Sequence, residues 1–253
     1  MTIKARIALA AAAVSLAFAG AAPVLADSFS ADQREEIGTI IKDYLLSHPE
    51  VMQDVMAELD KRQQSAEAEK HRAAVAENKA TLFTSPHQVV LGNPQGNVTI
   101  VEFFDYNCGY CKRALSDMLD LIKTDGNLKF VLKEFPVLGE GSVEAARVAV
   151  AARMQDSTGK KYIEFHQKLL GGSGRGAADK TRALAVAKEV GFDMPRLERD
   201  MGSDEVKKTI EEDMKLAEAL GVNGTPSYVV GEEVVVGAVG LDALREKISA
   251  ERK

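Results

Sequence analysis

The sequence predicts an α/β domain of two layers that follows an α-helical N-terminal segment. Two observations support this fold class. From residue 84 onward the hydrophobic pattern gives the order strand, helix, strand, then several helices, then two strands and a final helix. From residue 27 to about residue 82 the chain is rich in Ala, Glu, Gln and Lys and has no glycine after Gly38. We therefore expect a helical segment over 27–83 and an α/β domain over 84–253.

The first 26 residues have the pattern of an export signal. Lys4 and Arg6 precede an apolar run over 7–22, and residues 24–26 offer small side chains at the cleavage positions. No later stretch approaches the ~18 consecutive apolar residues of a membrane span. We expect a signal peptide over 1–26 and an exported, soluble mature protein.

The charge balance argues against one class of partner. The formal charge of −6 becomes −8 when Lys4 and Arg6 leave with the signal peptide. Lysines are interleaved with carboxylates along the chain, and no basic patch stands out. Because nucleic-acid binding needs a basic face, we expect no nucleic-acid partner.

The helical segment predicts two helices, 31–47 and 49–81, with a break at His48-Pro49. Ser30 with Gln33 and Ser47 with Glu50 have the spacing of capping boxes. Apolar residues recur at helical spacing along both helices and form what we call the apolar stripe: Ile37, Ile40, Ile41, Tyr44, Leu45, Met52, Val55, Met56 and Leu59. The stripe could pack on the protein's own α/β domain. We favour burial against other copies of the chain, since so long an uncovered stripe promotes aggregation.

The α/β domain is predicted element by element from turn signals and periodicity. Strands are expected at 88–91 and 97–104, a helix after the second strand, and a strand at 128–135 that a proline stops. A helical insertion covers about 142–220. A hairpin with strands 227–230 and 233–236 and a short helix at 241–248 complete the domain.

Cys108 and Cys111 are the only cysteines in the chain. A structural disulfide between them would close a very small ring and would stabilise a domain of this size little. A metal site needs further ligands, and the four histidines show no paired spacing near the cysteines, so we expect no metal and no cofactor. The remaining interpretation is a pair that forms its disulfide reversibly.

The position of the pair gives it this chemistry. It follows a strand and opens a helix, where backbone N–H groups and the helix dipole favour a thiolate. We expect Cys108 to be the attacking thiol. Cys111, one turn further into the helix, is expected to be less exposed and to act as the resolving thiol.

At these residues the chain resembles the thioredoxin superfamily, and within it the DsbA-like thiol–disulfide interchange proteins of the periplasm. The resemblance covers about 84–253 and includes the motif Cys108-Gly109-Tyr110-Cys111 and the loop Gly224-Thr225-Pro226. It implies a thioredoxin fold with a helical insertion, preceded by an α-helical stalk. It also implies a cis-proline at Pro226, and substrate contacts at Gly109, Tyr110, Thr225 and Pro226.

Glu102, six residues before Cys108, matches the buried acid beneath the active site of thioredoxin-like proteins. A carboxyl group in an apolar strand is costly to bury, which indicates a function such as exchanging a proton with Cys111. The alternative is that Glu102 lies at a wet edge. Lys133, in the neighbouring strand, is the expected charge partner of Glu102.

The resemblance also bears on the direction of the reaction. Gly109-Tyr110 between the cysteines and Thr225 before the proline are similar to periplasmic disulfide isomerases. The stretch at 44–50, YLLSHPE, on a helical stalk resembles the suppressor-of-copper-sensitivity protein C (ScsC) family. This implies a homotrimer held by its N-terminal helices, kept reduced by a membrane thiol–disulfide reductant, and acting on unfolded or misoxidised exported proteins in the periplasm.

Three other functions compete with an isomerase or reductase. A monomeric dithiol oxidase would introduce disulfides and would fold its stalk onto its own domain. A copper-binding protein could hold Cu(I) with two thiolates, although no Met or His adjoins the pair. An interaction module with vestigial cysteines would not need the proline loop.

Overall fold

The computed structural model describes residues 29–172 and 176–252, so the expected signal peptide lies outside the described residues. The chain divides into two units, one that ends at Asp60 and one that begins at Lys61. None of the helices in the described part of the chain is both long enough and apolar enough to cross a bilayer.

The first unit is helical. Helix α1 (Ala31–Ser47) begins at Ser30, whose hydroxyl accepts from the Gln33 N–H while the Gln33 side chain accepts from the Ser30 N–H. It ends at His48, and helix α2 (Pro49–Glu77) starts at the proline, as expected. Eight of the nine side chains of the apolar stripe are exposed in the single chain, and Leu45 is half-buried.

The helix expected over 49–81 is divided in two, which corrects the sequence prediction. Helix α2 stops at Glu77 and a short helix α3 (Lys79–Phe83) follows. The side-chain amide of Asn78 donates to the Ala74 carbonyl at 2.8 Å, so it competes with the backbone for that acceptor. Asparagine therefore interrupts the helix one turn before its expected end.

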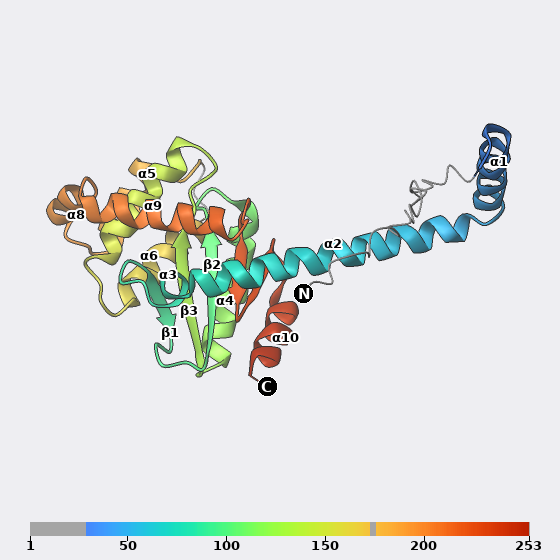
Figure 1. Ribbon diagram of the computed structural model, residues 1–253. Coiled ribbons are helices and arrows are strands. Elements are labelled where there is room, and N and C mark those ends of the chain that lie inside the picture. Colours follow the sequence, from blue (N-terminus) through green and yellow to red (C-terminus); the bar gives the residue numbers. More distant parts are fainter. Residues whose placement is uncertain (1–28, 173–175, 253) are drawn as a thin grey trace, which may run out of the picture. The chain divides into compact units, whose positions relative to one another are not determined.

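The second unit is built on a mixed sheet of five strands in the order β1-β3-β2-β4-β5 (Figure 1). Strands β2 and β3 are parallel at the centre, and the other neighbours are antiparallel. The strand bounds are β1 Val89–Gly92, β2 Val98–Phe104, β3 Leu128–Glu134, β4 Ser227–Val230 and β5 Glu233–Val236. The expected strands are confirmed to within a residue at either end.

Both faces of the sheet are covered. The face that carries Ile100 and Phe104 packs against α4 (Gly109–Thr124) and α10 (Leu241–Glu251), and we call it the α4 face. The face that carries Val101 and Phe103 packs against α9 (Asp204–Ala219) and α3, and we call it the α9 face. Alternate residues of β2 therefore enter two different cores.

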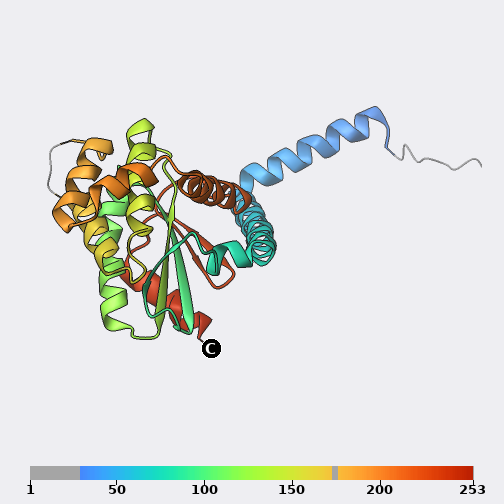
Figure 2. The ribbon, with the colours of Figure 1, turned by 90° about the vertical axis from the view of Figure 1, so that its left-hand side faces the viewer.

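The helical insertion follows β3, and most of its helices, coloured yellow-green to orange, lie at one side of the sheet in Figure 2. Besides α9 it contains α5 (Glu140–Arg153), α6 (Lys160–Gly171), α7 (Lys180–Val190) and α8 (Met194–Asp200). The chain returns to the sheet through Thr225-Pro226 into β4. These elements, with β2-α4-β3 and β4-β5-α10, form a thioredoxin fold with a helical insertion, as the sequence predicted.

Candidate active site

The two cysteines lie where β2 ends and α4 begins. Cys108 is the N-cap of α4, and its sulfur accepts a hydrogen bond from the Cys111 backbone N–H at 3.2 Å. Both cysteines are free thiols in this structure. The Cys108 sulfur therefore lies at the positive end of the helix, where a negative charge is stabilised.

The loop before β4 faces this sulfur. The Thr225-Pro226 peptide bond is cis, and the Thr225 carbonyl accepts a hydrogen bond from Cys108 Sγ at 3.2 Å. Pro226 is buried and Thr225 is half-buried. The structure thus brings together two groups that are 117 residues apart in the sequence.

Cys111 is completely buried on the α4 face of the sheet. Burial raises the pKa of the Cys111 thiol far above its ordinary value; the Asp105 backbone N–H opposes this and the Glu102 carboxyl adds to it. Cys111 therefore holds its proton until another group takes it. Cys108 is 6% exposed and Cys111 is 0% exposed, so Cys111 is the less exposed thiol, as the sequence predicted.

Glu102 is 3% exposed, so it does not lie at a wet edge. Its neighbours in the sheet register are Leu132 on β3 and Tyr228 on β4. Burial, with a contribution from Asp117, raises the pKa of Glu102 from 4.5 to about 8. At neutral pH it is a neutral carboxylic acid, and it interacts electrostatically with the thiol of Cys111.

Lys133 is not the partner of Glu102, and this expectation was wrong. In the register Lys133 lies opposite Phe103, whereas Glu102 lies opposite Leu132, so their side chains enter opposite faces. The Lys133 ammonium lies on the α9 face, 3.1 Å from Asp213 Oδ1, and donates to the Thr81 carbonyl at 2.9 Å. Lys133 thus links β3 to α9 through an ion pair and to α3 through a hydrogen bond.

Tyr110 presents an aromatic surface beside the cysteines. Its side chain is 59% exposed, and the Arg113 guanidinium lies 4.3 Å from its ring centroid. Gly109 has open space where a Cβ would be, so no steric contact requires a glycine there. Both residues are exposed to solvent.

A groove lies beside Cys108, between the start of α4 and the helical insertion. Its other lining residues come from the loop after β2, the start of α5 and the loop before it, the end of α6, and the start of α7 and the segment before it. They include Leu138, Gly141, Leu170, Ala178 and Arg182. Leu138 is 53% exposed. The groove offers a mixed surface beside the sulfur, with the apolar Leu138 and the basic Lys112 and Arg182 in its lining.

The loop that carries Cys108 is anchored by a chain of buried hydrogen bonds. The Tyr106 hydroxyl is 3.2 Å from both the Tyr162 hydroxyl and His166 Nδ1, and the Tyr162 hydroxyl donates to Glu134 at 3.1 Å. Burial lowers the pKa of His166 to about 3, so its ring stays neutral at physiological pH. His166 is buried in α6 of the insertion.

Sequence reasoning missed three polar residues at the site: Asp105, Asn107 and Ser142. Each is hydrogen-bonded to another member of the group next to Cys108. The signal that could have found them is the sequence Asp105-Tyr106-Asn107, which places two hydrogen-bonding side chains between an apolar strand and the first cysteine.

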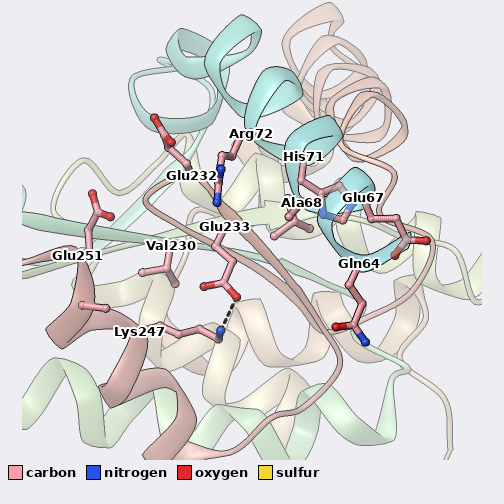
Figure 3. Close-up of a pocket in the computed structure, with 12 residues that line it drawn as sticks. Gln64, Glu67, Ala68, His71, Arg72, Val230, Glu232, Glu233, Lys247 and Glu251 are labelled. Atoms are coloured by element: carbon pink, nitrogen blue, oxygen red, sulfur yellow. Dashed lines mark hydrogen bonds and ion pairs between the residues drawn. The ribbon is translucent and has the colours of Figure 1, made fainter. Parts of the chain in front are cut away.

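A second pocket lies between α2, the β4-β5 hairpin and α10 (Figure 3). The figure shows Glu67, His71 and Arg72 on α2, with the Glu233–Lys247 ion pair across the pocket. Neither cysteine lines it. Within residues 29–172 and 176–252, no cluster of three or more His, Cys, Asp or Glu could hold a metal ion.

A dithiol at the start of a helix, opposite a cis X-Pro bond in a thioredoxin fold, is arranged for thiol–disulfide exchange. The fold and the site together define the class as a thiol–disulfide oxidoreductase.

The comparisons with known proteins agree with this class. The chain belongs to the DsbA-like thioredoxin domain family, whose model matches residues 99–249. Residues 33–66 match a second model, the copper resistance protein ScsC N-terminal domain. The two models therefore match separate parts of the chain.

Relatives of known structure cover most of the chain. A thioredoxin-like oxidoreductase from Silicibacter pomeroyi DSS-3 is 46% identical with a TM-score of 0.64, and the match covers 69% of this chain and 98% of that one. A linker-deletion mutant of Proteus mirabilis ScsC is 23% identical with a TM-score of 0.67, over 89% of this chain and 97% of that one. The second likeness shows the fold alone.

A curated relative, disulfide bond formation protein D of Bacillus subtilis, is 28% identical over 174 residues, which are 66% of this chain and 78% of that protein. Other curated relatives are Na⁺/H⁺ antiporters NhaA, of which the chain covers only 23 to 25%.

Proposed function

We propose that the protein is a periplasmic disulfide isomerase and reductase that acts on misoxidised exported proteins. The observation that carries this proposal is the contrast between the two sulfurs. Cys108 Sγ lies at a helix N-terminus, faces Thr225 and opens onto a groove, while Cys111 is sealed in the core. One thiol can meet a substrate disulfide, and the other can react only with its partner.

The reaction follows from this asymmetry. The Cys108 thiolate attacks one sulfur of a wrong disulfide, forms a mixed disulfide and releases the other substrate sulfur as a thiolate. A substrate thiolate then attacks the substrate sulfur of the mixed disulfide, which forms a new substrate disulfide and frees Cys108. Alternatively, the Cys111 thiolate attacks Cys108 Sγ, which reduces the substrate by two electrons and leaves the Cys108–Cys111 disulfide.

The direction is supported by the groups around the site. Gly109-Tyr110 and Thr225 are those of isomerase-like members, and the stalk matches the ScsC N-terminal model. Isomerisation consumes no electrons but needs a reduced Cys108, so a membrane thiol–disulfide reductant is the expected partner. Gly109, Tyr110, Thr225 and Pro226 form the surface that receives the substrate.

Oligomerisation is supported by the apolar stripe. We assign residues 27–83 to an oligomerisation stalk that forms a homotrimer and residues 84–253 to the catalytic domain, after removal of a signal peptide over 1–26. Ile40, Met56 and Leu59 are each about 60% exposed in the single chain. Burying such side chains against other copies removes apolar surface from water, which favours association.

A dithiol oxidase is the second candidate. It is favoured by the name of the Bacillus subtilis relative, disulfide bond formation protein D. An oxidase would run the same exchange backwards, with the Cys108–Cys111 disulfide accepting two electrons from a reduced substrate.

Parallel assays with ribonuclease distinguish the two candidates. We expect the reduced mature protein to restore activity to scrambled ribonuclease, and the oxidised protein to add little to the oxidation of reduced ribonuclease. A version without residues 27–60, which keeps the whole second unit with α3, should lose the first activity and keep simple disulfide reduction. Rapid oxidation of reduced ribonuclease, with no recovery of the scrambled enzyme, would instead establish the oxidase.

Glu102 is proposed to receive the proton of Cys111 when the mixed disulfide is resolved. Only the carboxylate form can accept a proton, and the pKa of about 8 means that this form grows as the pH rises toward 8. We expect the rate of resolution by Cys111 to rise through this range. In Glu102→Gln the rate should be lower and this part of the pH profile should be missing, as measured by stopped-flow reduction of a peptide mixed disulfide.

The same group makes stability depend on pH. The folded protein keeps a proton on Glu102 up to about pH 8, whereas an unfolded glutamate loses it near 4.5, so unfolding releases a proton between these values and stability falls. We expect the unfolding free energy of Glu102→Gln to rise relative to that of wild type by about 4 kcal/mol between pH 4.5 and pH 8. Urea titrations measure it, with the exposed Asp120→Asn as control. A difference that stays constant with pH would contradict the role of burial.

A further inference from the structure

The loop between β2 and Cys108 contains a buried carboxylate whose oxygens accept hydrogen bonds from three groups, none of which belongs to a cysteine. Asp105 is 1% exposed. Its Oδ1 accepts from the Asn107 backbone N–H and the Ser142 hydroxyl, both at 2.7 Å, and its Oδ2 accepts from the Leu138 N–H at 2.9 Å. Three donors therefore compensate for the burial of its charge.

Asn107 extends this network to the segment before α7. Its side-chain amide donates to the Ala178 carbonyl at 2.9 Å and accepts from the Ala178 N–H at 2.6 Å, so it binds both backbone polar groups of one residue. The same amide donates to the Ser142 hydroxyl at 2.8 Å, which joins it to Asp105. Three segments that are distant in the sequence are thus held by one polar cluster.

The segments that this cluster holds are the lining of the groove. Leu138, Ala178 and Asn107 all line the groove that contains Cys108. The Cys108 N–H donates to the Asp105 carbonyl at 3.0 Å, so the cluster and the reactive cysteine share one tight loop. The position of the groove surface relative to the sulfur therefore depends on the side chains of Asp105 and Asn107.

None of the side-chain bonds of the cluster reaches a cysteine sulfur. The contacts of Cys108 Sγ are the Cys111 N–H and the Thr225 carbonyl. A small disulfide, which needs only the sulfur, should react independently of the cluster. A polypeptide must place a segment in the groove while its disulfide reaches Cys108. Its reaction should therefore depend on the cluster.

We propose that Asp105 and Asn107 are positioning residues for polypeptide substrates. They fix Leu138 and the Ala178 backbone at a set position beside Cys108, so that an extended segment next to the reacting disulfide binds the groove while the disulfide meets the sulfur. This inference rests on the proposed function, since it names how the same site selects unfolded polypeptides over small disulfides.

The test compares a protein disulfide with a small one. Asp105→Asn keeps the shape of the side chain but replaces one acceptor oxygen by an NH₂ group, so it loses at least one of the three bonds. We expect kcat/KM for insulin reduction to fall by about 10-fold, mostly through KM, with the rate toward glutathione disulfide within about 2-fold of wild type. Asn107→Asp should behave in the same way, because it loses the donors to Ala178 and Ser142.

Two further variants distinguish a loss of positioning from a loss of folding in Asp105→Asn and Asn107→Asp. Ser142→Ala removes one hydroxyl and leaves both backbone bonds to Asp105, and it should show a smaller loss with the same selectivity. Asp213→Asn changes an equally buried aspartate that binds Lys133 on the α9 face, and it should lower stability without changing the ratio of the two rates.

The outcomes separate this inference from the proposed function. If Asp105→Asn, Asn107→Asp and Ser142→Ala lower both rates equally, or neither, the positioning role is wrong even when the wild type is active on insulin. If wild type reduces glutathione disulfide but neither reduces insulin nor repairs scrambled ribonuclease, the proposed function itself fails.

Discussion

Replacing Cys108 with serine is expected to reduce exchange with every disulfide to the uncatalysed rate, a loss of roughly 10³-fold or more. The attacking group is a thiolate, and a serine hydroxyl stays protonated at neutral pH. The sealed Cys111 cannot take over the attack, because it is fully buried and burial raises its pKa. Insulin reduction and glutathione disulfide reduction measure the two substrate classes.

Cys111→Ser is the matched control for this prediction. It makes the same change at the other end of the motif, yet it should leave the first attack intact and block only the release by the second thiol. Retention of more than a tenth of the wild-type rate by Cys108→Ser would show that Cys108 is not the attacking thiol.

Two acidic substitutions in the apolar stripe are expected to convert the proposed oligomer into single chains. Ile40→Glu with Met56→Glu places two carboxylates where the proposed stalk buries apolar side chains, and an unpaired carboxylate in an interface costs several kcal/mol. Light scattering after size exclusion should show the mass of one chain. Repair of scrambled ribonuclease should fall by about 10-fold, while glutathione disulfide reduction stays unchanged.

Thr39→Glu with Ala57→Glu is the matched control. Both residues are exposed and lie on the opposite sides of α1 and α2 from the stripe, so they add the same charges without touching it. If this pair also dissociates the protein, net charge and not the stripe governs assembly. If the stripe variant remains an oligomer, the stalk is not the assembly surface.

The sequence predicted the bounds of strands and helices well because glycine residues mark where these elements end. The hairpin strands Ser227–Val230 and Glu233–Val236 have the bounds that the pattern indicated. Gly231 lies in the turn with φ +58°, a conformation that glycine adopts without strain, and Gly191 at φ +88° ends helix α7. These signals act over a few residues and need no knowledge of tertiary contacts.

The prediction that Glu102 pairs with Lys133 was wrong because such a pairing depends on the register of the two strands. Both residues lie in seven-residue strands of similar composition, and a shift of one position moves a side chain to the other face. Only the observed pairing of Glu102 with Leu132 shows that the acid and the lysine enter different cores.

The polar cluster of Asp105, Asn107 and Ser142 was not predicted from the sequence, for a related reason. Its members bind partners that are 37 residues away for Ser142 and 71 residues away for Ala178. Aspartate and asparagine before a helix are expected in any turn, so their residue types alone indicate only local capping. The helical insertion supplies the partners, and its placement is a property of the whole fold.

The most direct measurement is the mass of the product formed when Cys111→Ser meets scrambled ribonuclease. If Cys108 attacks wrong disulfides in proteins and Cys111 resolves the intermediate, a covalent adduct of both chains should accumulate, linked through Cys108 by peptide mapping and cleaved by dithiothreitol. Absence of any adduct under conditions in which this variant still reacts with glutathione disulfide would contradict exchange with misoxidised proteins.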